Sequence, residues 1–180
     1  AAALFLVASG LSLIFGVMRL VNLAHGDFIV LAAYVILALS SAFFIPPFWA
    51  MLIALPFLFA LGWALQRVIL NRTVEENLLV PLLVTFGLQI IIQNGLLEGF
   101  TANSRRLSLG GIESASLSIG GISVGVMPLF TFAAAVAVIG GLSALFYMTA
   151  LGRKLRATSD NRTYVQIVGI NPHKVFAIAM

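Results

Sequence analysis

The apolar positions of this chain form long unbroken runs instead of alternating with polar ones. One stretch without a charged side chain covers residues 28–66, which is thirty-nine positions without Asp, Glu, Lys or Arg. One helix of that length would measure about 58 Å, roughly twice the ~30 Å hydrocarbon core of a bilayer. The run therefore predicts two spanning helices. Pro46 and Pro47 predict the turn between them, because proline disfavours helix in the residue before it.

The same pattern extends along the whole chain and predicts five full spans and the start of a sixth near Val175. The five predicted spans are residues 2–18, 28–44, 48–66, 78–97 and 127–150. The predicted fold is an all-α polytopic transmembrane helix bundle, because continuous apolar runs exclude a barrel and only helices otherwise satisfy the backbone in lipid. Residues 1–180 are expected to form a single domain that is truncated at its C-terminal end, since the apolar run opened by Asn171-Pro172 is short.

The longest predicted outer loop covers residues 98–126 and has an alternating pattern of its own. Residues 116–124 alternate polar and apolar side chains around Gly120-Gly121, which predicts a short β-hairpin with a two-residue turn, and residues 107–109 hint at another strand. A plain solvated loop is the alternative.

Charged residues are few and unevenly distributed, and their distribution predicts how the bundle is oriented in the membrane. Only 9% of residues are charged, against about a quarter in soluble domains. Eight of the ten basic residues fall in segments that share one side of the membrane: Arg19, Arg67, Arg72, Arg153, Lys154, Arg156, Arg162 and Lys174. That side is predicted to be cytoplasmic by the positive-inside rule. The chain has no cysteine, so thiolate metal sites are excluded.

Motifs for catalysis are missing from this sequence. It contains no Walker A motif, so the chain is not expected to bind ATP itself. Residues 121–125 fit G-x-S-x-G, but His25 and His173 are both predicted to lie across the bilayer from Ser123. We therefore expect no enzymatic activity, no metal site, no cofactor and no nucleic-acid partner for this chain.

A polar stripe runs along the predicted fourth span, where Thr85, Gln89 and Gln93 recur every four residues. Polar groups in lipid are costly unless they face a partner helix or a wet cavity. The stripe therefore predicts either interhelical hydrogen bonds or a translocation path for a solute.

The connection between the first two spans holds a histidine and an aspartate. Gly26 is predicted to end one helix and Asp27 to cap the next, with a structural role for His25 preferred over a proton relay. No ionisable group is predicted in the middle of a span, which counts against an ion-coupled carrier.

The most informative loop covers residues 151–174. The run 158–161 consists of capping residues, and it predicts a short helix from Arg162 to Val168 that Gly169 ends in the left-handed conformation. Tyr164, Ile167 and Val168 share one apolar face of that helix. Such a face predicts a partner surface or, alternatively, an interfacial helix lying on the lipid headgroups.

These motifs together resemble a known family. The stretch Asn22-Leu23-Ala24-His25-Gly26-Asp27 resembles the N-F-A-H-G-E/D signature of permease subunits of bacterial branched-chain amino acid ABC importers. A second stretch of that family is similar to residues 85–94, and its cytoplasmic coupling segment to residues 152–171. Leu23 stands where the family commonly has Phe, and Val165 where it commonly has a small residue.

The resemblance implies a multi-pass inner-membrane subunit that pairs with a homologous permease. Two cytoplasmic ATPase subunits, which bind the ATP, and a periplasmic amino-acid-binding protein complete such an importer. The coupling residues implied by the resemblance are Arg156, Asp160, Tyr164, Val165, Val168 and Gly169.

Several functional alternatives remain open at this level. Related permeases import urea or short amides, so the motifs do not specify the solute, nor whether the permease pair is homo- or heterodimeric. A stand-alone secondary transporter or channel and a non-transporting membrane scaffold are the rival hypotheses.

Overall fold

The computed structural model describes residues 2–18, 21–73, 79–101, 103, 115–119 and 122–179. The five long helices of the bundle are α1 (Ala2–Met18), α2 (His25–Phe43), α3 (Pro47–Val68), α4 (Leu79–Phe100) and α5 (Val126–Met148). Within these described residues, α2 to α5 are long and apolar enough to cross a membrane, whereas α1 is an apolar helix of 17 residues. The protein is thus an all-α, multi-pass membrane protein, which confirms the predicted fold class.

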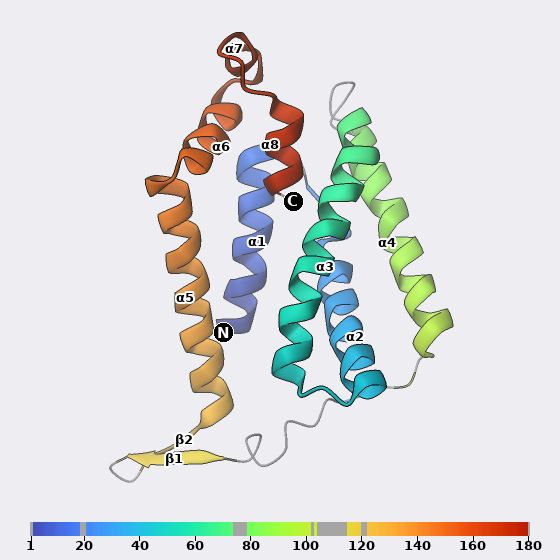
Figure 1. Ribbon diagram of the computed structural model, residues 1–180, viewed down its shortest axis with the longest axis vertical. Helices are drawn as coiled ribbons and strands as arrows, with labels where there is room; N and C mark the ends of the chain where they lie inside the picture. The colour runs from blue at the N-terminus through green and yellow to red at the C-terminus, as the bar shows by residue number, and fades with distance from the viewer. Residues whose placement is uncertain are drawn as a thin grey trace.

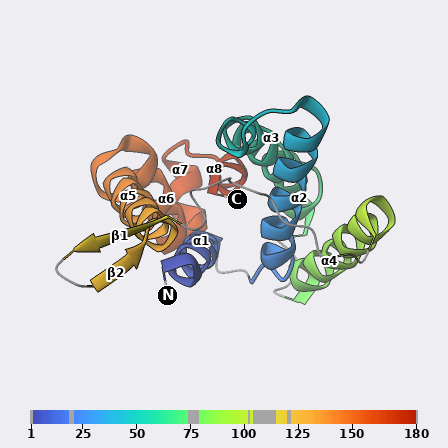
Figure 2. The ribbon, with the colours of Figure 1, turned by 90° about the horizontal axis from the view of Figure 1, so that it is seen from below.

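The helices form two groups that meet along one seam (Figures 1 and 2). In the first group α1 packs against α5, and in the second group α2 packs against both α3 and α4. The groups touch mainly where α3 meets α8 (Pro172–Ala179), the short helix at the end of the described chain. Two further helices, α6 (Ala150–Asp160) and α7 (Arg162–Ile167), connect α5 to α8.

The connections that follow α2 alternate between the two ends of the bundle, as the predicted topology requires (Figure 1). One end carries α6, α7 and the chain that follows α3, including the 3-10 turn η1 (Leu70–Arg72). The other end carries the α2–α3 turn and the hairpin. The described basic residues 67, 72, 153, 154, 156 and 174 belong to the first end, which we call the basic end.

The turn between α2 and α3 follows the proline prediction. α2 ends at Phe43, and Phe44 takes the left-handed conformation with φ 55°. Pro46 is extended and Pro47 opens α3, where its missing N–H costs no helical hydrogen bond. Ser40 Oγ donates to the Ile45 carbonyl at 2.8 Å and closes the turn.

The outer hairpin is confirmed. Strands β1 (Ser116–Ile119) and β2 (Ile122–Gly125) pair antiparallel, with Ser116 opposite Gly125 and Ile119 opposite Ile122. That register leaves two residues, 120 and 121, for the turn, and these lie outside the described residues. The possible strand at 107–109 also lies outside them.

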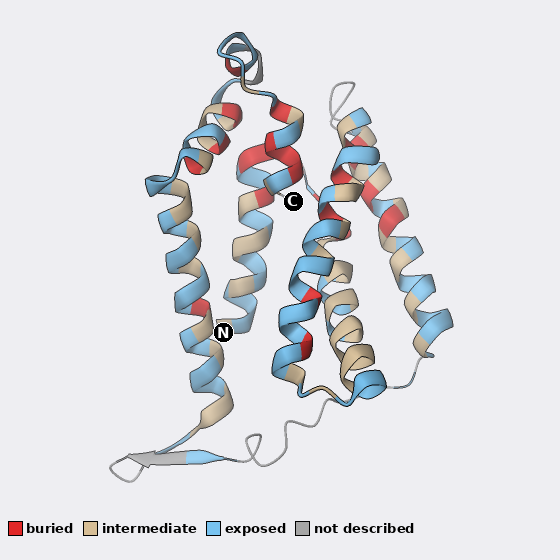
Figure 3. Ribbon diagram, viewed as in Figure 1, coloured by how far each residue is buried: buried red, intermediate tan, exposed pale blue. Residues whose placement is uncertain are grey.

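Buried residues are concentrated at the basic end. Figure 3 shows many of them where α1, α6 and α8 meet and in the upper parts of α3 and α4, and others in the lower half of α3, where Ala50 and Ala54 are buried. By contrast, α2 has no buried residue, although its sequence is almost entirely apolar. An apolar helix with so little protein around it is suited to lipid, where exposed apolar side chains carry no penalty.

Candidate functional site

The connection between α1 and α2 enters the bundle and does not stay at the basic end. His25 Nε2 lies 3.3 Å from the Val7 carbonyl oxygen, to which the Nε2–H tautomer donates. Val7 precedes the last residue of α1, Met18, by eleven positions. At ~1.5 Å per residue, His25 therefore lies roughly 16 Å along the helix axis from the basic end of α1. The predicted cytoplasmic placement of His25 was wrong, because it assumed that the connection follows the shortest route.

Hydrogen bonds within the connection start α2 earlier than predicted. Asn22 Oδ1 accepts from the Ala24 N–H at 3.0 Å, and the Asn22 carbonyl accepts from the His25 N–H at 3.2 Å. This turn begins α2 at His25, and the residue before it, Ala24, is fully buried and makes no side-chain cap. The predictions that Gly26 ends a helix and that Asp27 caps the next one were therefore wrong, since both residues lie inside the first turn of α2.

The carboxylate of Asp27 instead meets the fourth span. Gln93 Nε2 donates to Asp27 Oδ1 at 2.9 Å. Gln93 is fourteen residues into α4, about 21 Å along that helix. His25 and Asp27 thus sit beside the middle of α1 and α4, which overturns the expectation that no ionisable group lies within a span. Of the four signature residues, Asn22 lies in the α1–α2 connection, and His25, Gly26 and Asp27 form the start of α2.

The polar stripe on α4 faces this turn through two of its three members. Thr85 is 2% exposed, and its Oγ1 accepts from the Leu23 N–H at 3.3 Å while donating to the Leu82 carbonyl at 3.0 Å. Gln93 binds Asp27, and Gln89 is half-buried between them. Gln93 therefore makes an interhelical hydrogen bond of the kind that one interpretation of the stripe predicted, whereas Thr85 bonds the backbone of the α1–α2 connection.

An apolar cavity of about 460 Å³ separates the two helix groups beside the turn. Its walls come from α1, α2, α3, α5 and α8, and Asn22 and His25 are the two polar side chains among its lining residues. The stripe residues Thr85, Gln89 and Gln93 do not line it. Ala179, the last residue of α8, also reaches this cavity.

The basic end is built around a sharp corner between α5 and α6. Thr149 is extended, and its Oγ1 accepts from the Gly152 N–H at 3.1 Å and so caps α6. A Cβ placed on Gly152 would lie 2.2 Å from the Phe146 carbonyl oxygen, so only glycine fits there. The segment 151–160 was predicted as a basic loop with capping residues; it is a helix, because Thr149 caps it and the corner directs its apolar face onto α1.

Of the predicted coupling residues on α6, Arg156 is half-buried on the side that faces the bundle, whereas Asp160, at the end of the helix, is exposed. The Arg156 guanidinium donates to the Phe146 carbonyl and stacks over the Tyr147 ring at 5.3 Å. Asp160 and Arg156 line a cleft of about 430 Å³ between α1, α5 and α6. Nearby, Ser159 Oγ donates to the Gly16 carbonyl at 2.5 Å. This face of α6 therefore anchors the segment to the spans.

The short helix α7 matches its prediction closely. Asn161 Oδ1 accepts from the Tyr164 N–H at 3.2 Å, so Asn161 is the capping residue of the predicted run. Gly169 has φ 81°, the Gly169 N–H bonds the Gln166 carbonyl, and the Ile170 N–H bonds the Val165 carbonyl. These are the two hydrogen bonds of a Schellman motif.

The faces of α7 are sharply different. Tyr164, Ile167 and Val168 are 68%, 76% and 78% exposed, whereas Val165 is 6% exposed and faces the protein. α7 projects beyond α6 and α8 at the extreme basic end (Figure 1). A capped turn that holds three large apolar side chains away from the protein is a surface suited to a partner.

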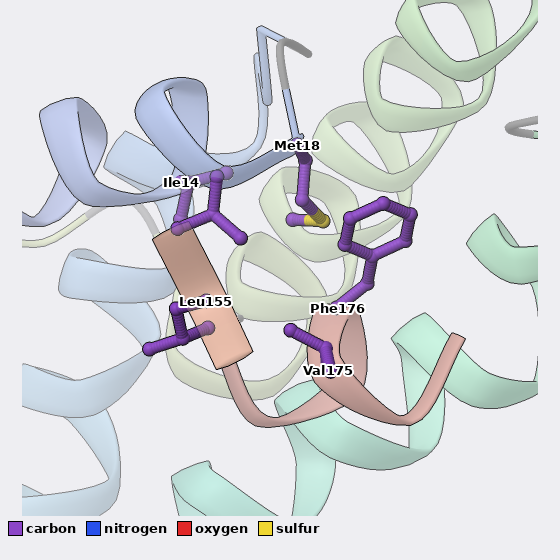
Figure 4. Close-up of a cluster of buried hydrophobic side chains, with 6 residues drawn as sticks. Ile14, Met18, Leu155, Val175 and Phe176 are labelled. Carbon is purple, nitrogen blue, oxygen red and sulfur yellow. The ribbon is translucent and has the colours of Figure 1, made fainter. Parts of the chain in front are cut away.

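A compact apolar cluster holds this segment to the first span (Figure 4). It joins Ile14, Val17 and Met18 of α1 to residues of α6 and α8, namely Leu155, Val175 and Phe176. Phe176 is 1% and Met18 2% exposed. The cluster therefore fixes α6 and α8, the two helices that flank α7, to α1.

Two polar residues near the basic end were missed by the sequence analysis. Gln66 is fully buried in α3, and its Nε2 donates to Asn71 Oδ1 at 3.1 Å. Asn71 Nδ2 in turn donates to the His173 carbonyl in the first turn of α8 at 3.3 Å. These bonds tie the second helix group to the segment that carries α7. The available signal was a glutamine at the end of a charge-free span, where a polar side chain needs a partner.

Metal ligands do not cluster in the part of the chain described by the structure, where no three His, Asp or Glu residues lie close enough to hold an ion.

Comparison with known proteins agrees with this arrangement. The chain is 23% identical over 184 residues to the high-affinity branched-chain amino acid transport permease BraD of Pseudomonas aeruginosa, covering 96% of this chain and 60% of BraD. It is 27% identical to the permease LivH of Escherichia coli, with the same coverage, and 28% identical to a probable LivH of Methanocaldococcus jannaschii, covering 95% of this chain and 55% of that protein. No solved structure matches the chain significantly.

The chain thus spans about 60% of the length of the first two relatives. All of residues 1–180 match the family described as branched-chain amino acid transport system permease components. The order of the spans, the intramembrane signature turn and the capped helix at the basic end all occur within that match. This chain belongs to the family of branched-chain amino acid transport system permease components.

Proposed function

We propose that the protein to which this chain belongs is the membrane-spanning subunit of an ATP-driven importer. It would carry branched-chain or related hydrophobic amino acids across the bacterial inner membrane. The observation that carries the proposal is α7, which presents Tyr164, Ile167 and Val168 outward at the basic end. Membership of the family and the printed function of its relatives support the choice of solute.

In this proposal α7 docks in a groove of a cytoplasmic ATPase subunit. Tyr164 and Val168 contact the groove, and Gly169 sets the angle at which α7 leaves α8. Arg156, Asp160 and the buried Val165 hold the segment to the bundle behind that contact. When ATP binding closes a pair of ATPase subunits, the movement of α7 passes through Phe176 to α1 and through Asn71 to α3. The two helix groups then shift relative to each other.

The remaining partners follow from the same proposal. A homologous permease subunit completes the membrane part, and a periplasmic amino-acid-binding protein delivers the solute at the end that carries the hairpin. ATP is bound by the partner ATPase subunits.

We place the solute path along the intramembrane turn, with Thr85, Gln89 and Gln93 on one side. Non-helical backbone at membrane depth is tolerated where protein buries it or where it lines a cavity, and broken helices of this kind mark binding sites in transporters. Uptake assays with leucine, isoleucine, urea and acetamide would distinguish the proposed solutes from the urea and amide alternative.

The docking contact is tested with Tyr164→Asp in the assembled importer. A charge at the centre of an apolar interface typically weakens binding by more than about tenfold. Solute-stimulated ATP hydrolysis should fall accordingly, while membrane insertion remains normal. Gly169→Asp should act in the same direction, and Tyr164→Phe is the matched control that keeps the ring. Wild-type levels of solute-stimulated ATP hydrolysis in Tyr164→Asp would contradict the docking proposal.

A second candidate function has one observation in its favour. His25 and Asp27 lie within the membrane, and ionisable groups there often serve ion-coupled carriers. Uptake by the permease without any ATPase subunit, abolished by a proton ionophore, would support the carrier. Uptake that requires a co-expressed ATPase would support the importer.

A further inference from the structure

A pocket between α6 and α8 has the composition of an amphiphile site. It measures about 300 Å³, and the loop 169–171 closes one end. Its polar lining side chains are Lys154, Lys174 and Asn171, and its apolar lining consists of Leu151, Leu155, Ile170, Val175 and Ile178. No acidic residue is among these lining residues.

The two lysines approach the pocket from different helices. Lys154 is on α6 and Lys174 is on the first turn of α8, and both side chains are exposed. Two ammonium groups on one pocket repel each other unless an anion lies between them. An anionic ligand that bridges α6 and α8 would relieve this repulsion.

The apolar walls of the pocket determine which kind of anion fits it. Leu155 and Val175 are 2% and 7% exposed and belong to the core cluster, so the floor of the pocket is rigid. A free phosphate would neutralise the lysines but leave the apolar walls uncovered. A phospholipid covers both, because its phosphate pairs with the lysines and its glycerol and first methylenes lie on Leu151 and Ile178.

The position in the fold agrees with this ligand. The pocket is at the basic end, at the border between the spans and the α7 segment (Figure 1). Basic pockets between helices on the cytoplasmic side of membrane proteins bind anionic headgroups. Lysine suits such a border, because its stem covers apolar surface while its ammonium stays in the headgroup layer.

We propose that this pocket binds the phosphate headgroup of an anionic phospholipid, which links α6 to α8. The inference is independent of the proposed transport function, since it needs only a membrane with anionic lipid. A bound lipid would hold the segment that carries α7 against the spans, so anionic lipid should raise the stability of the basic end.

The test uses the full-length permease in its purified complex, with phosphatidylglycerol as the probe. Native mass spectrometry from phosphatidylcholine micelles measures how much added phosphatidylglycerol stays bound. The wild-type complex should retain it, and Lys154→Gln with Lys174→Gln should reduce retention by roughly fivefold per lysine. Arg153→Gln is the matched control, because Arg153 is an exposed neighbour that does not line the pocket. The double replacement by Arg should keep the lipid and shows that the fold tolerates changes there.

Two results would overturn the proposal. The first is equal retention of phosphatidylglycerol in the Lys154→Gln, Lys174→Gln variant and in the wild type. The second is displacement of the lipid by millimolar inorganic phosphate, which would assign the pocket to a free anion. Loss of retention in the Gln variant alone, with retention in the Arg variant and in Arg153→Gln, supports the lipid site.

Discussion

Two connections of this protein, the segment from α6 to α8 and the α1–α2 connection, are built in opposite ways. The segment from α6 to α8 is held by an apolar cluster and by local caps, with Phe176 and Met18 at its centre. The α1–α2 connection is held by single polar contacts to distant helices, such as Gln93 to Asp27. Close packing therefore stabilises the first connection, whereas the second depends on a few hydrogen bonds.

The difference also bears on how each connection could be altered. A cluster of close-packed side chains loses several kcal/mol when one large member is removed, whereas interhelical hydrogen bonds in membrane proteins average about 0.6 kcal/mol. Substitutions in the first connection should therefore mainly lower stability, whereas substitutions in the second should mainly impair function.

The largest expected effect is on chemical accessibility. The chain has no cysteine, so single cysteines can be introduced without removing others. Ala24→Cys, at a fully buried position of the α1–α2 connection, should barely react with a membrane-impermeant maleimide. Arg153→Cys on the exposed face of α6 should react quickly in inside-out vesicles. Similar reaction rates at the two positions would show that the α1–α2 connection lies at the membrane surface.

Removal of a core side chain should have the next largest effect. Phe176→Ala should lower the free energy of unfolding by about 3–5 kcal/mol, because Phe176 is 1% exposed at the centre of the cluster. Phe130→Ala, at a position on α5 that is 62% exposed, is the control and should change it little. Reversible unfolding in mixed micelles measures the free energy of unfolding of both variants. Equal losses in the two would contradict a packed apolar cluster at the basic end.

The corner between α5 and α6 should be sensitive to a single methyl group. In Gly152→Ala the new Cβ would meet backbone atoms of Phe146 and Leu145, so the corner must shift. We expect a loss of about 1–3 kcal/mol in stability, together with weaker ATPase coupling in the complex. Gly141→Ala on α5 meets nothing within 4 Å and is the matched control. A stable, fully coupled Gly152→Ala would show that the corner tolerates a wider angle.

The smallest effect concerns the contact between α2 and α4. A double-mutant cycle of Gln93→Ala with Asp27→Ala should give a coupling energy of about 0.6 kcal/mol. The same cycle with Asn94→Ala should give none, because Asn94 Nδ2 donates to the Ile90 carbonyl of its own helix. Gln93→Ala should impair solute uptake while changing the free energy of unfolding little. A coupling energy near zero for Gln93 and Asp27 would contradict the hydrogen bond between them.

Sequence reasoning was most successful where the signals are local. Charge-free runs predicted every long helix to within a few residues, because a span must be apolar over its whole length. Asn161, Gly169 and Ile170 predicted the start and end of α7, since caps depend on neighbours within a few positions. Pro47 and the pattern around residues 120–121 likewise predicted the α2–α3 turn and the hairpin.

Tertiary structure decided the features that join distant segments. Thr85 meets Leu23 across 62 positions, Gln93 meets Asp27 across 66, and Asn71 meets His173 across 102. Nothing in the local pattern distinguishes a connection that stays at the membrane surface from one that enters the bundle, because both contain the same turn residues. The sequence by itself determined that the chain crosses a membrane and the approximate extent of its five long helices, but not the start of α2 or the presence of α6. Only packing placed His25 and Asp27 within the bundle, where contacts with other helices replace the water that these side chains lose.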